Sequence, residues 1–357
     1  MSRKLDMTIG ETSDVQMTRD RPLGMFTYGD GACMLKWVAH QPHAIIEGTA
    51  MDAHRNRPLK VGLFLQTFEN MRTRVAPSWP DLLLLAQRAE AVGFDSIWVG
   101  DHLFVRFPPD DVYQIWEGWS MLSALAASTT RVELGSLVAC TSFRNPALLA
   151  KMAVTVDEIS GGRLTLGLGA GWHEPDFRAF GYPYDHRVSR FEEALTLIAT
   201  LLRKGKINFE GRFHQARECE LRPRGPRAQG PPILVGAAGE RMLRLTARHA
   251  DIWNRDLGPA ESITELPEWR TRVDAACTKE GRDPNSLERY AMIGIETPGA
   301  PSSEDSTSHK GSPEELADAL RTYASEGISH VQVWLEPATL AGIEAFAPTL
   351  ELLDRSS

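Results

Sequence analysis

One histidine in this chain stands where a group that transfers protons would be useful. His102 follows the apolar run SIWVG and the acidic residue Asp101. Imidazole titrates near neutral pH, so a histidine at the end of a strand can act as a general acid or base. Asp101 is the carboxylate expected to orient the ring. We predict catalytic roles for both residues, the alternative being a histidine that only shapes its loop.

Two glycine-rich segments suggest a ligand site: LTLGLGAGWHEP at 164–175 and GAAGER at 236–241. Clustered glycines indicate a positive φ or a close approach to the backbone, because glycine is otherwise costly on folding. The second segment opens a predicted helix, whose free N–H groups and positive end favour phosphate. Neither segment matches GxxxxGKS or a Rossmann-type GxGxxG, so these nucleotide-binding modes are not supported. Tight turns alone are the alternative.

Tryptophan, histidine, glutamate and cysteine side chains offer further chemistry. Trp172 and Trp253 offer flat faces that could stack on a ring system or simply pack. His173 and Glu174 are adjacent and lack the i, i+4 spacing of a helical metal pair, so we predict no metal site. The four cysteines form no CxxC pair and are expected to be reduced thiols, mostly buried and inert. They are Cys33, Cys140, Cys219 and Cys277.

From residue 59 onward, short apolar segments that predict β-strands alternate with longer segments whose caps and apolar spacing predict α-helices. Ser78 and Gly93 bracket the first predicted helix, Asn145 opens another, and Ser312 with Glu315 forms a capping box. Eight strand and helix pairs follow one another, which is the number that closes a parallel (β/α)8 TIM barrel. The predicted strands are 60–66, 96–101, 132–138, 164–169, 231–237, 251–254, 291–295 and 330–335.

Such a barrel carries its active site on the loops at the carboxyl ends of the strands. His102 and both glycine segments would therefore meet at one mouth. Two irregular stretches, 206–231 with a predicted hairpin at Glu210-Gly211 and 297–311, would decorate the barrel without adding a domain. The first of them and the segment 104–117 are the expected specificity loops, and their apolar and aromatic residues indicate an apolar substrate.

Composition narrows the class of partner. The 357 residues include 39 basic and 47 acidic side chains, for a formal charge of −8. This balance argues against nucleic acid or an anionic membrane as the main partner and favours a small molecule. No apolar run has the length of a membrane span, and the N-terminus lacks the apolar core of a signal peptide. We expect a soluble, cytoplasmic protein.

The first 57 residues show no sustained period and are expected to be an extension of the barrel. Three interpretations compete: a disordered tail, a segment that packs on a neighbour, or a start codon assigned too early, since Met51 precedes the first strong strand. Residues 58–357 form the predicted catalytic domain.

Long motifs then identify a resemblance over about residues 58–357. WVGDH, the stretch LGSLVACTSFRNPALLAKMAVTVDEISGGRLTLGLGAGWHEPDFRAFGYP, and PPILVGAAGERMLRLTARHADIWN together resemble the luciferase-like monooxygenase family of TIM barrels. The middle stretch is most similar to the subgroup assigned to the 8-hydroxy-5-deazaflavin coenzyme F420, although FMN users share much of it.

The resemblance implies a cofactor lying across the barrel mouth. Its phosphate would meet the two glycine segments, and its ring would lie near Leu137, Val138 and Trp253. A strained peptide, often cis, follows strand three in the family and would fall at Leu137-Val138. Family members that oxidise sugar phosphates carry a glutamate where this chain has Trp172, which argues against that reaction unless Glu174 reaches the site. The implied cofactor-binding residues are Leu137, Val138, Gly169, Ala170, Gly171, Trp172, Gly236, Ala237, Gly239, Glu240, Arg241 and Trp253.

The expected reaction is hydride transfer between F420 and a small organic substrate, with His102 moving the proton. One alternative is a two-component monooxygenase that receives reduced FMN from a separate reductase. Another is a non-catalytic protein that binds the flavin or deazaflavin. A metal-dependent hydrolase is disfavoured, because the first strand ends in Gln66, Thr67 and Phe68 without an HxH pair. The family-level expectation for assembly is a homodimer.

Overall fold

A computed structural model describes residues 57–70, 73–107, 111–257, 263–298, 300 and 308–355. The predicted extension 1–57 lies outside these residues except for Arg57, so the proposed domain boundary stays a prediction. Arg57 bonds Asp95 at 3.0 Å and Asp354 at 2.5 Å, which ties the start of the described chain to its end.

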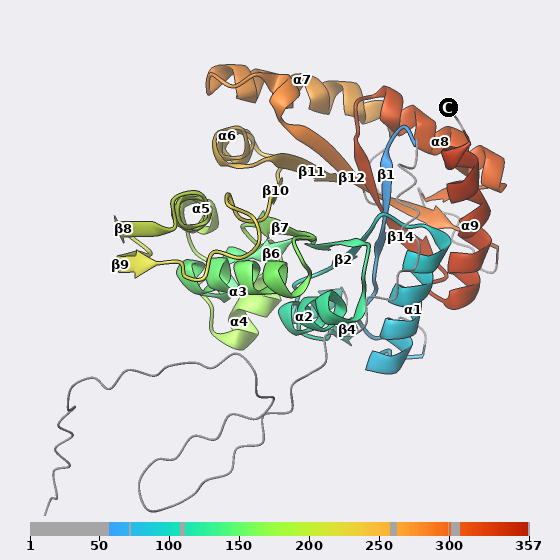
Figure 1. The fold of residues 1–357 in the computed structure, drawn as a ribbon, viewed down its shortest axis with the longest axis horizontal. Helices are drawn as coiled ribbons and strands as arrows, with labels where there is room; N and C mark the ends of the chain where they lie inside the picture. The colour runs from blue at the N-terminus through green and yellow to red at the C-terminus, as the bar shows by residue number, and fades with distance from the viewer. Residues whose placement is uncertain are drawn as a thin grey trace, which may run out of the picture. The chain divides into compact units, whose positions relative to one another are not determined.

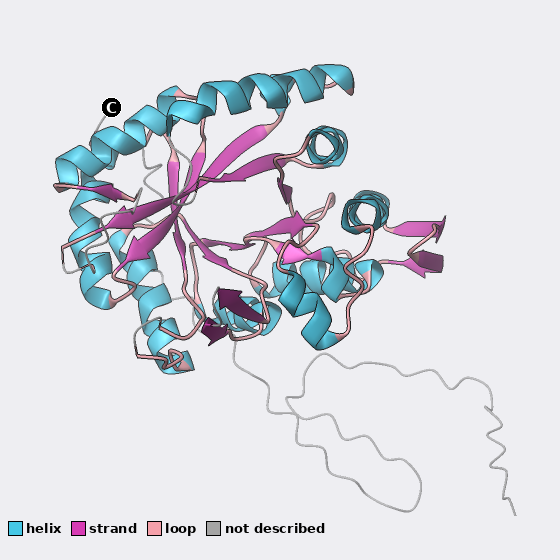
Figure 2. Cartoon of the chain, turned by 180° about the vertical axis from the view of Figure 1, so that it is seen from behind, coloured by secondary structure: helices cyan, strands magenta, loops and turns pink. Residues whose placement is uncertain are grey.

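The main sheet closes into a barrel of eight parallel strands, as predicted (Figures 1 and 2). Each strand pairs with the next one of the barrel along the chain, and the last pairs with the first, as expected for right-handed βα units. Figure 2 shows the strands at the centre and the helices around them. The barrel strands are β1 (Lys60–Phe64), β2 (Ser96–Val99), β5 (Glu133–Ser136), β7 (Leu164–Gly169), β10 (Ile233–Gly236), β11 (Ile252–Asp256), β12 (Glu288–Glu296) and β14 (His330–Glu336).

The helices follow the strands in the expected alternation, and the shorter strands lie in the connections. The α-helices are α1 (Trp79–Val92), α2 (Gly118–Ser128), α3 (Pro146–Ile159), α4 (Glu174–Phe180), α5 (Arg187–Lys204), α6 (Glu240–His249), α7 (Leu266–Lys279), α8 (Pro313–Ser325) and α9 (Leu340–Asp354). The remaining strands are β3 (Phe104–Phe107), β4 (Asp111–Gln114), β6 (Ala139–Cys140), β8 (Lys206–Glu210), β9 (Gln215–Glu220) and β13 (His309–Lys310). Within the described residues, 3₁₀ turns cover Thr141–Phe143, Ile263–Glu265 and Pro284–Ser286.

The predicted caps place the helix ends correctly. Ser78 begins α1 in a capping box with Asp81, and Gly93 ends it at φ 111°, a left-handed conformation that favours glycine. Asn145 caps α3, and Ser312 with Glu315 caps α8. These local signals, each worth about 1 kcal/mol, explain why the helix starts were readable from sequence.

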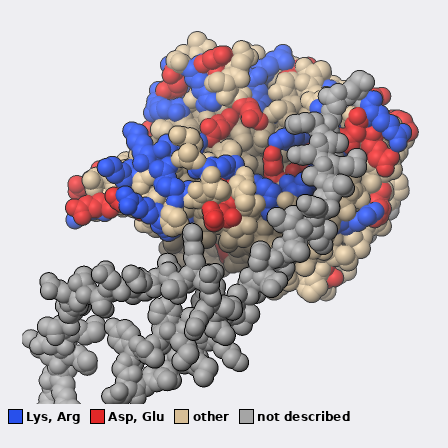
Figure 3. Space-filling view, viewed as in Figure 1, with Lys and Arg blue, Asp and Glu red and all other residues tan. Residues whose placement is uncertain are grey.

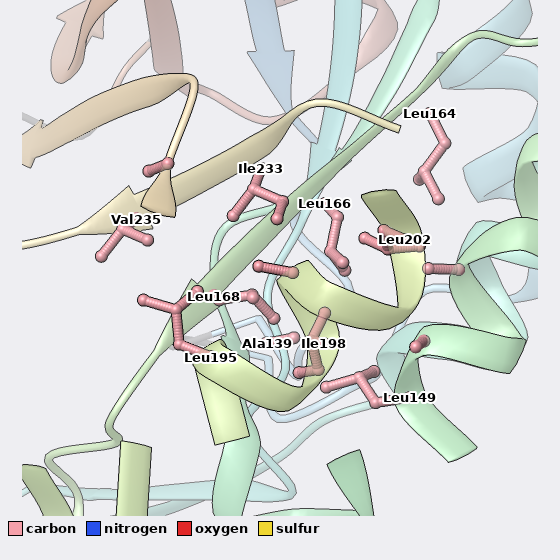
Figure 4. Packing of buried hydrophobic residues seen from close by; sticks show 14 of the residues in the cluster. Ala139, Leu149, Leu164, Leu166, Leu168, Leu195, Ile198, Leu202, Ile233 and Val235 are labelled. Carbon is pink, nitrogen blue, oxygen red and sulfur yellow. The ribbon is translucent and has the colours of Figure 1, made fainter. Parts of the chain in front are cut away.

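The largest apolar core lies between the barrel wall and its covering helices. Leu166 and Leu168 of β7 and Ile233 of β10 meet side chains such as Leu149 of α3 and Ile198 of α5 (Figure 4). All five are fully buried. Because parallel strands covered by helices are apolar on both faces, these segments read as continuous hydrophobic runs.

The indole of Trp98 lies in the bore of the barrel, in a cluster with Leu234, Ile252 and Tyr290. Trp98 of β2 is fully buried, and a Cβ at Gly135 would lie 2.1 Å from its ring while one at Gly62 would lie 2.6 Å from its Nε1. The two neighbouring strands therefore carry glycine to make room for the indole. Its N–H donates to Ser96 Oγ at 2.7 Å, and Ser96 lies 2.7 Å from Nε2 of His330.

His330 is expected to make stability depend on pH. Burial lowers its pKa well below the ordinary value, so the folded chain keeps it neutral while the unfolded chain takes up a proton below about pH 6.5. Stability attributable to this group is therefore present above about pH 6.5 and is lost as pH falls, with a slope of at most about 1.4 kcal/mol per pH unit.

The test is urea unfolding of the wild type and of His330→Gln between about pH 7.5 and about pH 5.5. The variant should show a shallower loss of unfolding free energy toward acid pH. Equal slopes in the two proteins would contradict the assignment.

Connections between barrel strands and helices contain further secondary structure. Two of these elements were not predicted from the sequence, and a third was. β3 and β4 form an antiparallel hairpin after β2, and α4 follows β7. Both are too short for their periodicity to stand out. The hairpin expected at Glu210-Gly211 is present as β8 and β9.

Charged side chains of both signs mix on the surface. Figure 3 shows lysine and arginine beside aspartate and glutamate on the face in view. Several are ion pairs, including Arg248 with Glu280 at 2.8 Å. No helix in the described part of the chain has the length and apolar character needed to cross a bilayer.

Candidate functional site

His102 is held at the barrel mouth by a carboxylate that sequence reasoning missed. Its Nδ1 lies 2.7 Å from Oδ2 of Asp176, and its side chain is 30% exposed while that of Asp176 is 1% exposed. The other oxygen of Asp176 accepts the backbone N–H groups of Leu103 at 3.3 Å and Phe104 at 3.1 Å. A carboxylate acceptor requires the proton on Nδ1, so Nε2 of the neutral ring is free to take up or return a proton.

Asp101 does not orient His102, which corrects the expectation for this residue. Its carboxylate is buried and accepts hydrogen bonds from Nη1 and Nη2 of Arg144, at 2.7 and 2.8 Å. It also accepts one from the backbone N–H of Cys140, at 3.0 Å. Burial raises the pKa of Asp101, and Arg144 opposes that shift. Arg144 also pairs with Glu117 at 2.5 Å. Asp101 is thus committed to fastening the loops after β2 and β5 together.

A second histidine and an exposed indole adjoin His102. The ring centroid of Trp172 lies 5.3 Å from that of His102, edge to face, and the centroid of His173 lies 5.7 Å away. His173 is buried, its Nε2 accepts the N–H of Arg106 at 3.1 Å, and burial lowers its pKa. His173 therefore supports the hairpin β3–β4 as a neutral acceptor, and Trp172 keeps a free face.

The first glycine segment owes its glycines to packing and turn geometry. A Cβ at Gly167 would lie 1.9 Å from the carbonyl oxygen of Ser136, and one at Gly169 would lie 2.6 Å from Cγ2 of Val138. Gly171 has φ 77°, and a Cβ there would meet Phe177 at 2.6 Å. The expectation of a close approach or a positive φ is therefore confirmed at these positions, and the atoms that approach the backbone are the protein's own. Whether Gly169, Ala170 and Gly171 bind a cofactor through their backbone stays a prediction.

The structure has a cis peptide bond between Leu137 and Val138, where the resemblance placed one. Both side chains are partly buried against the barrel-bore cluster of Trp98 and Tyr290. Val138 also lies close to Gly236 of β10: a Cβ added at Gly236 would lie 3.5 Å from Cγ2 of Val138. Val138, which follows β5, thus packs against glycines of both β7 and β10.

The second glycine segment leaves open space. A Cβ at Gly239 would meet no heavy atom within 4 Å. Gly239 is the N-cap residue of α6, and no capping side chain bonds the free N–H groups there. The side chains of Glu240 and Arg241 turn to neighbouring helices: Glu240 pairs with Lys279 of α7 at 3.2 Å, and Arg241 bonds Ser189 of α5 at 3.1 Å. Only the backbone of this segment therefore remains to meet an anion.

Trp253 does not face the mouth, which corrects a second expectation. It is 1% exposed, its Nε1 donates to the carbonyl of Ala237 at 2.9 Å, and its ring lies 6.4 Å from that of Trp269 on α7. The next residue, Asn254, is buried with an Oδ1 that has no hydrogen-bond partner. Asn254 is thus the buried polar group of β11, and sequence reasoning assigned it no role.

The cysteines that the structure describes are free thiols, as expected, and two of the three are buried. Cys140 and Cys277 are buried and Cys219 is partly buried, all as free thiols, and Cys33 lies outside the described residues. Burial raises the pKa of Cys140 to about 12, so its thiol is protonated at neutral pH. Among the described residues, no group of three histidine, cysteine or acidic side chains could hold a metal ion.

Replacing Asp176 by asparagine is expected to lower turnover about 10²-fold, because the amide no longer fixes the tautomer and the position of the His102 ring. The affinity for cofactor should stay within about twofold, since Asp176 is covered by the protein. Steady-state kinetics and a cofactor titration check this expectation. Unchanged kcat in a folded variant would contradict the positioning role.

Comparisons with known proteins agree with this geometry. A sequence model of the luciferase-like monooxygenase family matches residues 59–295. A phthiodiolone/phenolphthiodiolone dimycocerosates ketoreductase from Mycobacterium tuberculosis is 32% identical over 249 residues, which are 64% of this chain and 63% of that protein. The pyrimidine monooxygenase RutA of Rhizobium rhizogenes is 34% identical over 187 residues, or 51% of this chain and 50% of that one. The chain thus spans less than two thirds of the length of these relatives.

Solved structures show the same fold at low sequence identity. An F420-dependent secondary alcohol dehydrogenase in complex with an F420-acetone adduct superposes with a TM-score of 0.69 at 19% identity, covering 83% of this chain and 99% of that one. The EDTA monooxygenase of Chelativorans sp. BNC1 gives 0.65 at 16% identity, covering 83% and 94%.

Proposed function

The chain belongs to the luciferase-like monooxygenase family, and we propose that it is an oxidoreductase that transfers a hydride between coenzyme F420 and a small organic carbonyl or alcohol. The observation that carries the proposal is His102, fixed at the mouth through Nδ1 by buried Asp176 with Nε2 left free. Hydride transfer to a carbonyl requires one proton for the oxygen, and a single oriented imidazole supplies it.

The residues at the mouth fit a phosphate-bearing ring cofactor. The uncapped start of α6 offers N–H groups beside open space at Gly239, which suits a phosphate. The unpaired Oδ1 of buried Asn254 offers a hydrogen-bond acceptor to a polar ring edge. Both F420 and FMN carry a phosphate and a polar pyrimidinedione edge, so this fit supports either one.

The chain's own residues then have defined tasks. When bound, F420 supplies or accepts the hydride. Nε2 of His102 donates a proton to the carbonyl oxygen in the reducing direction and takes it from the hydroxyl in the oxidising direction. Asp176 holds the ring in this orientation throughout.

The relatives support two versions of the reaction. The ketoreductases carry out a reduction in which a carbonyl gains a hydride and a proton, and this favours the F420 version. The pyrimidine monooxygenase favours the second candidate, in which reduced FMN from a separate reductase is used with oxygen. A homodimer in the cytoplasm stays our prediction for either version.

Titration with F420 and with FMN, each oxidised and reduced, tests the proposal by quenching of tryptophan fluorescence. We expect selective binding of F420 and oxidation of its reduced form by a ketone under anaerobic conditions. Selective binding of reduced FMN with oxygen consumption would replace this proposal by the monooxygenase. Binding of F420 without turnover of any carbonyl or alcohol would favour the non-catalytic binding protein.

A further inference from the structure

Several exposed apolar side chains lie in the connections on the face of the barrel that carries the candidate site. Eight large hydrophobic side chains are exposed among the described residues, and four of them lie in connections that follow barrel strands. These connections form the catalytic face. Exposed apolar clusters on a soluble protein mark places where a ligand binds. The four are Val75, Trp116, Trp172 and Phe180.

Trp172 is exposed although its backbone is fastened. Its carbonyl accepts the hydroxyl of Tyr184 at 3.0 Å, and the preceding carbonyl, of Gly171, accepts Arg187. The side chain itself is 62% exposed and meets His102 edge to face. A rigid backbone that presents a large apolar ring to solvent next to a proton-transfer group is suited to hold a substrate there.

A line of rings leads away from His102 to a second exposed residue. The centroids of Trp172 and His173 lie 5.1 Å apart, those of His173 and Phe104 lie 5.9 Å apart, and those of Phe104 and Phe180 lie 6.5 Å apart. The inner two are buried, while Phe180 at the far end is 55% exposed. We name this set the aromatic strip.

The charges beside the aromatic strip balance each other. Glu174 and Arg178, both on α4, form an ion pair at 3.0 Å. The third charged residue of α4, Asp176, is buried against His102, so the exposed surface of α4 offers no unpaired cation to attract an anionic substrate. The indole of Trp172 supplies one donor and no acceptor, so it cannot satisfy the hydroxyl groups of a sugar.

We propose that the aromatic strip selects a substrate whose reacting carbonyl or hydroxyl lies at His102 and whose extended apolar chain lies along Trp172 toward Phe180. The inference rests on the proposed function and adds the substrate class: a ketone or secondary alcohol with a long alkyl or aryl chain. Each methylene laid on the exposed ring of Trp172 or Phe180 leaves water, so affinity rises with the length of chain that reaches them.

The probe is a homologous series of methyl ketones from 2-butanone to 2-undecanone. Their affinities are measured by calorimetry, both in the protein alone and in the protein saturated with oxidised F420. We expect about twofold to fourfold tighter binding per added methylene. Phe180→Ala should weaken only the long ketones, because Phe180 lies farthest from His102, whereas Trp172→Ala should weaken all of them.

Leu84→Ala is the matched control, because Leu84 is 51% exposed on the outer side of α1 and belongs to no such strip. It should leave the whole series unchanged. Affinity independent of chain length in both states, or an equal loss for Leu84→Ala and Phe180→Ala, would overturn the inference. Binding that depends on chain length, with no oxidation of reduced F420 by any ketone, would overturn the proposed function. The role of the aromatic strip in binding apolar chains would then still stand.

Discussion

Replacing His102 by asparagine is expected to lower kcat by about 10²–10⁴-fold, the usual contribution of a general acid or base. Asparagine fills a similar volume and can still meet Asp176, but it does not carry a proton between pH 5 and 8. Cofactor affinity should change little, because the proposed phosphate site lies at Gly239 and α6 and not at the imidazole. Stopped-flow oxidation of reduced F420 by a ketone, followed by its absorbance, measures the loss.

The matched control for this variant is His186→Asn. His186 is a half-exposed histidine with φ 51°, a conformation that asparagine adopts readily, and its nearest carboxylate is Asp185 at 3.8 Å. It should keep full activity. If His102→Asn also keeps full activity while it binds F420 normally, the proton must come from another group and the proposed mechanism fails.

Replacing Gly167 by alanine is expected to destabilise the fold by about 3 kcal/mol or more. An added Cβ would lie 1.9 Å from the backbone oxygen of Ser136, and a backbone atom in a neighbouring strand cannot rotate away. The same site is tied by Ser136 Oγ, which donates to the carbonyl of Gly167 at 2.8 Å and accepts its N–H at 3.0 Å. The two strands would have to separate and lose these bonds.

Urea unfolding of the variant beside Gly236→Ala tests this expectation. Gly236 is also a barrel-strand glycine, but an added Cβ would lie 3.5 Å from Val138, an ordinary contact. We expect a change of at most about 0.5 kcal/mol there. Equal midpoints for the two variants would mean that the strands near Gly167 adapt, and the packing explanation for this glycine would be lost.

The sequence by itself determined the architecture and indicated where the candidate site lies. Ser78, Asn145 and Ser312 mark helix starts through hydrogen bonds to residues two or three positions away, so no tertiary contact is needed to find them. Eight alternating strands and helices lead to one closed barrel, and the rule that active sites lie at the carboxyl ends of its strands then directs attention to His102. The cis bond at Leu137-Val138 was found where the family resemblance implied it.

Only the tertiary structure decided which side chains meet at that site. His102 and Asp176 are 74 residues apart in the chain, and nothing in either local pattern distinguishes Asp176 from the adjacent candidate Asp101. The orientation of Trp253 and Asn254 was equally hidden, because a parallel strand that is apolar on both faces has no alternation to read. Which residue faces the bore depends on strand register and tilt, and these are set by contacts among all eight strands once the barrel closes.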